Sequence, residues 1–101
     1  MDPTITLLEN KISFSNEAIS LLNLSAGERV AVNYVQVSSE YTYPVIGKAE
    51  YFVDKEAGNK LTKSQTISFR GIQHKVLSLY GTEFKLVPHK EGIYKLQSIN
   101  N

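Results

Sequence analysis

The 101-residue chain contains no cysteine, and this absence excludes disulfide bonds, thiolate metal ligands and cysteine nucleophiles. No apolar run comes near the roughly 20 residues that a membrane-spanning helix requires. The chain starts with Met-Asp-Pro-Thr, which places an acid where a secretory signal peptide carries basic residues. These absences predict a cytoplasmic protein that does not enter a membrane.

Sequence motifs of catalysis and cofactor binding are missing as well. No serine lies in a Gly-x-Ser-x-Gly context, and no glycine-rich phosphate loop occurs. The two histidines, His74 and His89, have no further metal ligand at a suitable spacing. We therefore expect a protein without enzyme activity, catalytic residues, metal, cofactor or small-molecule substrate.

Composition and periodicity indicate a single domain over residues 1–101. Hydrophobic residues make up 42% of the chain and charged residues 21%, which is typical of globular proteins. A capping Ser15 predicts a helix that stops near residues 25–27, and apolar residues at helical spacing predict a second helix over 72–80. Alternating apolar residues predict the strands, which we expect at 4–8, 11–14, 29–37, 43–53, 65–69, 82–87 and 93–99. Loops are expected at 38–42, 54–60 and 88–92.

The chain also contains an internal similarity. Lys-Ile-Ser-Phe at 11–14 recurs as Thr-Ile-Ser-Phe at 66–69, and with one deletion Gly27 falls on Gly81. The pattern predicts repeat units over about 4–37 and 60–88, followed by a final strand at 93–99. The expected fold class is α+β and mainly β: a small barrel-like sheet from two strand–helix–strand repeats with two short helices. The alternative is a chance similarity.

The first repeat resembles a known structural unit. The stretch 11–32, with Gly27-Glu28-Arg29-Val30 as its turn, is similar to the repeat of AbrB/MraZ-type swapped-hairpin barrels and double-psi β-barrels, the cradle-loop barrel superfamily. In that superfamily a strand leads into a short helix, a Gly-acid turn and a returning strand. The second repeat lacks the acid after Gly81. AbrB-type regulators hold DNA with arginines near strand and helix starts, so the resemblance implies a DNA contact at Arg70.

Charge is distributed unevenly along the chain. Residues 1–59 carry four basic and eight acidic side chains, whereas residues 60–101 carry seven basic and two acidic ones. A basic face on the second repeat would contact the phosphates of a nucleic acid. The residues expected in that face are Lys60, Lys63, Arg70 and Lys75. The alternative is that both halves mix in space and the charges interleave.

Tyrosines gather in the middle of the chain, and a tyrosine-rich surface is typical of protein interfaces. The tyrosines expected to contact a protein are Tyr34, Tyr41, Tyr43 and Tyr51. The alternative is that these side chains line the rim of the core with their hydroxyls in water. We predict a non-enzymatic protein–protein interaction or assembly module of a small accessory protein, such as those of phages, that binds a protein partner or itself. A nucleic-acid-binding or transcription-regulatory protein that uses the basic second repeat is the alternative.

Overall fold

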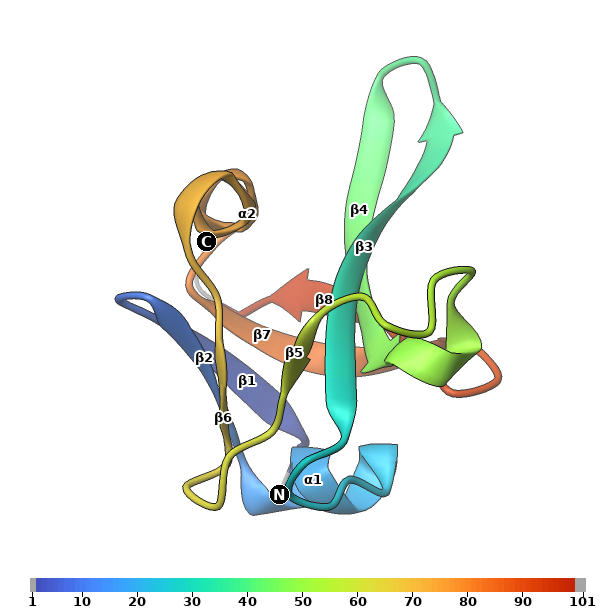
Figure 1. Cartoon of the computed structure of the whole chain (residues 1–101). Coiled ribbons are helices and arrows are strands. Elements are labelled where there is room, and N and C mark those ends of the chain that lie inside the picture. The colour runs from blue at the N-terminus through green and yellow to red at the C-terminus, as the bar shows by residue number, and fades with distance from the viewer. Residues whose placement is uncertain (1, 100–101) are drawn as a thin grey trace.

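The computed structural model describes residues 2–99, so residues 1, 100 and 101 of the expected domain lie outside the described part. Within it the chain forms eight strands, two α-helices and one short 3-10 helix (Figure 1). In chain order these are β1 (Thr4–Leu8), β2 (Lys11–Phe14), α1 (Asn16–Leu22), β3 (Arg29–Ser38), β4 (Tyr41–Lys48), η1 (Ala49–Tyr51), β5 (Asn59–Lys60), β6 (Thr66–Ser68), α2 (Gly71–Ser78), β7 (Glu83–Lys90) and β8 (Ile93–Ser98).

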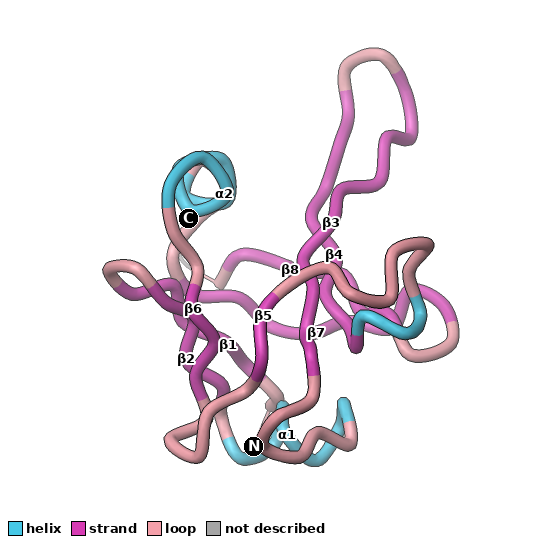
Figure 2. The backbone as a smooth tube through the Cα atoms, in the orientation of Figure 1, coloured by secondary structure: helices cyan, strands magenta, loops and turns pink. Residues whose placement is uncertain are grey.

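The strands form one antiparallel sheet in the order β5-β3-β4-β8-β7-β1-β2-β6. The sheet curls until its two end strands meet. Asn59 Nδ2 of β5 donates a hydrogen bond to the Ser68 carbonyl of β6 at 2.6 Å. The two short helices lie at different ends of the curled sheet, as the tube in Figure 2 shows. The expected mainly β, barrel-like fold with two short helices is therefore confirmed.

The core lies inside the curled sheet. Along β1 and β2 every second side chain points inward, as the alternation in the sequence predicts, and Ile5 and Ile12 are fully buried. Leu22 of α1 and Leu77 of α2 are buried in the same cluster. A second, smaller group of buried apolar side chains lies on the outer face of the sheet, beneath the segment that follows β4. Its members are Ala31, Val45, Ala49 and Ile93.

Helix α1 begins where the sequence predicts and ends earlier. The Ser15 hydroxyl accepts the backbone N–H of Ala18 at 3.1 Å, which is the expected N-cap. The helix ends at Leu22 because Asn23 adopts the left-handed conformation, with φ 54°. Gly27, with φ 93°, therefore lies in the turn that follows and does not end the helix.

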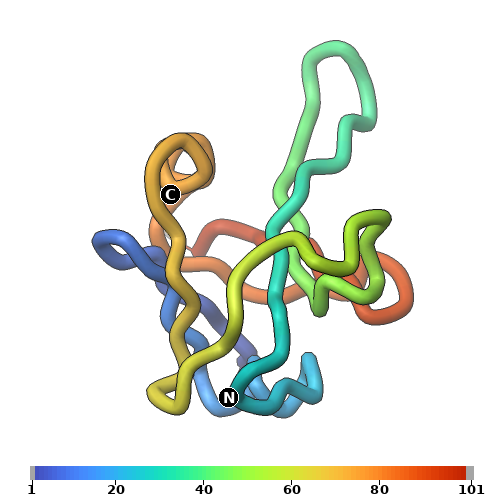
Figure 3. The backbone as a smooth tube through the Cα atoms, viewed as in Figure 1, coloured from blue at the N-terminus to red at the C-terminus, as the bar shows by residue number. Residues whose placement is uncertain are grey.

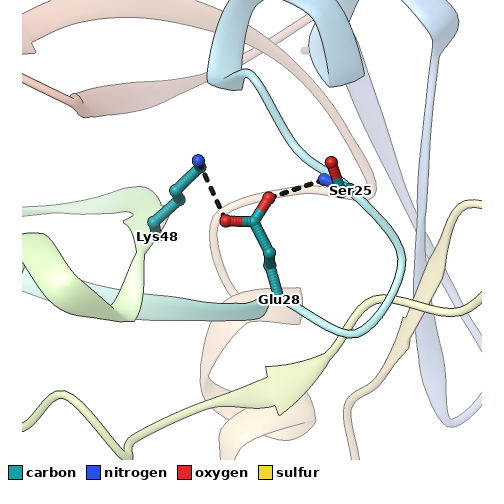
Figure 4. A network of polar contacts seen from close by, with 3 residues as sticks. All are labelled: Ser25, Glu28 and Lys48. Carbon is teal, nitrogen blue, oxygen red and sulfur yellow. Dashed lines mark hydrogen bonds and ion pairs between the residues drawn. The ribbon is translucent and has the colours of Figure 1, made fainter.

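That turn is held by Glu28, the acid of the Gly-acid pair (Figure 4). One carboxylate oxygen accepts the Ser25 N–H at 2.7 Å, and the other lies 3.0 Å from Lys48 Nζ at the end of β4. The hydrogen bond from Lys48 lowers the pKa of Glu28, and the Ser25 N–H acts in the same direction, while burial opposes them. Glu28 thereby links the start of β3 to the end of β4.

Several element boundaries differ from the prediction. The strand expected at 43–53 starts at Tyr41 and stops at Lys48, where η1 begins. Gly47 lies so close to the backbone of Gly92 that a Cβ would come within 2.5 Å of the Gly92 carbonyl oxygen. A glycine inside the expected strand indicates a bulge or bend at this position, but it does not indicate which segment comes close. The loop expected at 88–92 is shorter, because β7 continues through Pro88 to Lys90. The loop expected at 54–60 ends in β5.

Candidate protein-interaction surface

The hairpin of β3 and β4 projects from the rest of the sheet. Strand β5 pairs only with Arg29 and Val30 of β3, and β8 pairs only with residues 45–47 of β4. From residue 32 to residue 44 the two strands therefore pair with each other alone. We call residues 32–44 the arm. At its base Val32 packs against the core and Pro44 is buried, and Figures 1 and 3 show the rest of it extending well beyond the sheet.

The arm forms because its strands are rich in β-branched and aromatic residues. Its tip is a tight turn, in which the Ser38 hydroxyl accepts the N–H of Glu40 at 3.3 Å. The strand register shifts between Gln36 and Ser38, so that Val37 has no cross-strand partner and is 62% exposed. Tyr41, at the other side of the tip, is 49% exposed. The tip thus presents apolar and aromatic surface to the solvent.

Tyr41 and Tyr43 are joined by two side chains from the neighbouring strands. The Tyr43 ring lies 5.7 Å from the Tyr41 ring and 5.6 Å, edge to face, from the ring of His89 on β7. The Tyr43 hydroxyl also makes a 3.1 Å hydrogen bond with His89 Nδ1. Lys95 Nζ of β8 lies 4.7 Å from the Tyr43 ring centroid and donates to the Tyr41 hydroxyl at 3.2 Å. We call these four residues the aromatic cluster.

Tyr51 lies on the same outer side of the sheet, at the end of η1. Its ring covers Gly92 so closely that a Cβ there would lie 2.5 Å from the ring. Tyr51, His89, Val45 and Ile93 line a shallow cavity of about 220 Å³. His89 therefore links Tyr51 to the aromatic cluster, and the structure places three of the four predicted tyrosines along one side.

Tyr34 lies apart from the other three tyrosines, because its cross-strand partner Pro44 belongs to the opposite face of the arm from Tyr43. Its ring lies 5.8 Å from the ring of Tyr80, which follows α2. The Tyr34 hydroxyl is buried and has no hydrogen-bond partner among residues 2–99. Burial raises the pKa of Tyr34, and Tyr80 raises it further. Tyr34 thus lines the junction between the arm and α2.

The side chains of the four predicted cations are all exposed, and they are spread over residues 60–75 of the chain. Lys60 lies on β5 opposite Arg29, Arg70 immediately precedes α2, and Lys75 lies within α2. The turn between β5 and β6, which carries Lys63, lies at the other end of the view from α2 (Figure 1). The four cations therefore do not converge on one point, and none has an ion pair within the described range 2–99.

The histidines do not come together. His74 on α2 contacts the Leu8 carbonyl through Nε2 at 2.7 Å, whereas His89 belongs to the aromatic cluster. Across residues 2–99 no three His, Cys, Asp or Glu side chains are grouped as metal ligands. The helices of the same range are all too short or too polar to span a bilayer.

Two members of the aromatic cluster, His89 and Lys95, were not among the predicted interaction residues. They reach the tyrosines through the pairing of β4 with β8 and of β8 with β7. The pairing of β7 with β8 follows from the turn expected between them, because only Glu91 and Gly92 separate the two strands. No spacing in the sequence specifies the pairing of β4 with β8, because these two strands are far apart along the chain.

Comparison of the chain with family models gave no match, and comparison with curated proteins and with solved structures gave none either.

Proposed function

We propose that this protein is a non-enzymatic assembly module and that its arm makes the protein–protein contacts. The observation that carries the proposal is the extension of β3 and β4 past their neighbours, with Val37 62% and Tyr41 49% exposed at the tip. A two-stranded ribbon is marginally stable alone in water. A partner that covers the tip would bury this apolar surface and stabilise the arm.

The aromatic cluster supports the same function. Tyrosine side chains have few rotatable bonds, so they lose little conformational entropy when a partner binds. Tyr41 and Tyr43 are already held by Lys95 and His89 before any partner arrives. Such pre-ordering reduces the free energy that binding must supply.

The experiment compares two double variants with the wild type by light scattering over a series of protein concentrations. The arm variant carries Val37→Ser and Tyr41→Ser. The control variant carries Val53→Ser and Leu79→Ser, which also remove exposed apolar side chains (105% and 80% exposed) but lie outside the arm. Circular dichroism checks that each variant folds.

We expect the wild type and the control to have a mass above that of the monomer, and the arm variant to remain monomeric. A wild type that stays monomeric at every concentration would contradict the proposal. So would an arm variant that associates as strongly as the wild type.

We also propose that the barrel arose from two copies of one strand–helix–strand unit, as in the superfamily that the sequence resembles. Two facts support this. The strand order has a twofold symmetry when it is read as a closed ring. If β1, β2, β3 and β4 are exchanged with β5, β6, β7 and β8, in that order, the ring read in the opposite direction has the same strand order. In the pairing of β2 with β6, Ile12 lies opposite Ile67, its counterpart in the repeat. The test is an experimental structure, in which residues 11–32 and 66–87 should superpose after a twofold rotation.

A further inference from the structure

One edge of β3 has no strand partner along the arm. Strand β4 occupies the other edge as far as Ser38, and β5 ends its pairing at Val30. A side chain on Gly58 would collide with the carbonyl oxygen of Val30, which shows that this carbonyl points toward the β5 side. Because backbone groups alternate along a strand, the N–H and C=O groups of residues 32, 34 and 36 also point to that side. Beyond β5 they meet no strand within residues 2–99, although the Tyr34 N–H donates to the side-chain Oδ1 of Asn33 at 2.9 Å.

This free edge lacks the features by which proteins protect exposed strands. Edge strands are usually blocked by charged side chains, proline or a very short length. Residues 30–39 contain no charged residue, no proline and no glycine. The opposite edge of the arm is different, because Pro44 of β4 has no N–H to donate and does not pair with β8. The arm therefore has one blocked edge and one that is open to pairing.

From these observations we infer that the free edge of β3 pairs with the same edge of a second copy of this chain, in antiparallel orientation. The inference rests on the proposed function and names the partner and the contact. A twofold axis between two identical strands produces antiparallel pairing and a closed dimer. The uncharged strand meets its copy without any contact between like charges. Because the arm projects from the barrel, two arms can approach each other before the barrels meet (Figure 3).

The pairing has a geometric signature that spin labels can measure. The chain contains no cysteine, so a cysteine introduced at Asn33, Val35 or Val37 gives a single label per chain. In antiparallel pairing about a twofold axis, the distance between equivalent labels has one minimum along β3. The component of this distance along the strand increases by about 7 Å for each residue away from that minimum, which is twice the rise per residue of a strand.

We expect pulsed electron paramagnetic resonance on the three labelled proteins to show this series, with a label at Ser20 on α1 as the distant reference. A dimer whose minimum falls on β4, at a label on Thr42, would overturn the inference but leave assembly through the arm intact. The same holds for a dimer in which the β3 distances hardly change with position. A chain that stays monomeric would overturn both the inference and the proposed function.

A matched pair of charge variants gives a second readout. Gln36→Lys places a lysine on the free edge of β3, and Thr42→Lys places the same charge on its cross-strand partner in β4. In the proposed dimer Gln36→Lys places a lysine within the paired stretch of each copy, so its dimer dissociation constant should rise on the order of tenfold or more. Thr42→Lys should stay close to the wild type. If Gln36→Lys dimerises as tightly as the wild type, the inference is wrong.

Discussion

Replacing Glu28 by glutamine removes the charge that holds the turn before β3. In the wild type the carboxylate accepts the Ser25 N–H at 2.7 Å and lies 3.0 Å from Lys48 Nζ. Glutamine has the same shape and still offers a carbonyl oxygen to Ser25. It presents no negative charge to Lys48, whose side chain is only 14% exposed. The substitution therefore removes the ionic part of both contacts and leaves the packing unchanged.

The expected loss can be worked out from these two contacts. An exposed ion pair contributes about 0.2–1 kcal/mol, and because Lys48 is mostly buried we take a value near the upper end. A hydrogen bond to a neutral acceptor is weaker than one to a carboxylate by roughly 0.5 kcal/mol or more. Together the Glu28→Gln variant should lose about 1.5 kcal/mol of unfolding free energy. For a domain of this length that corresponds to a decrease of roughly 6 °C in Tm.

The loss should depend on pH in a definite direction. Lys48, then the Ser25 N–H, lower the pKa of Glu28 in the folded state. A carboxyl whose folded pKa lies below its unfolded value of about 4.3 stabilises the protein fully above that value and loses this effect as the pH falls through the folded pKa. The difference in stability between wild type and Glu28→Gln should thus be complete at neutral pH and shrink in acid.

The assay is urea unfolding of both proteins at neutral pH and at several acidic values, with Glu9→Gln as the control. Glu9 is exposed in the turn between β1 and β2, so its replacement should change stability by less than about 0.5 kcal/mol. The reasoning is refuted if Glu28→Gln is as stable as the wild type at neutral pH. A stability gap that stays constant through the acidic range would refute the pKa argument in particular.

Tyr34→Phe removes a buried hydroxyl that has no partner, so it should raise the unfolding free energy in urea by about 1 kcal/mol; a clear decrease would show that the hydroxyl is bonded. Gly58→Ala should lower Tm, with a loss of about 2 kcal/mol, because φ is 74° and the new methyl meets the Val30 carbonyl. Ser15→Ala should lose about 1–2 kcal/mol in urea unfolding, since the hydroxyl accepts two backbone N–H groups. A gel shift with single-stranded DNA at low salt tests the nucleic-acid alternative, and because the cations are spread we expect no shift. That alternative would be restored by a shift that disappears when four cations are replaced by alanine, namely Lys60, Lys63, Arg70 and Lys75.

Local signals in the sequence were sufficient for much of the barrel. The strands expected at 4–8 and 11–14 are β1 and β2 with the same bounds, because alternation over a short run depends only on which face is buried. The start of α1 after its N-cap Ser15 was also predictable from local sequence, since an N-cap side chain bonds to the first turn of its own helix. The end of β4 was predictable only in part, because Gly47 indicates a bend in the strand but not its close approach to Gly92, after which β4 ends at Lys48.

The candidate surface was predictable only in part. Tyr41, Tyr43 and Tyr51 were expected to contact a partner, and they lie along one outer side of the sheet. Tyr34 lies on the other face, although it was assigned to the same group, because neighbouring positions along a strand alternate between faces. The tyrosine composition of the segment was informative, while the face of each ring depended on the strand register.

By itself, the sequence determined that this protein is mainly β, that two short helices interrupt the strands, and that cysteine chemistry plays no part in it. Apolar periodicity and caps carry that information, since each residue is constrained by its near neighbours. The tertiary structure decided which strands are adjacent, how far each pairing extends, and hence that β3 and β4 continue past their neighbours as an arm with one open edge. The physical reason is that the backbone hydrogen bonds of a sheet join any two extended strands, whatever their side chains, so their partners are chosen by the packing of the whole chain.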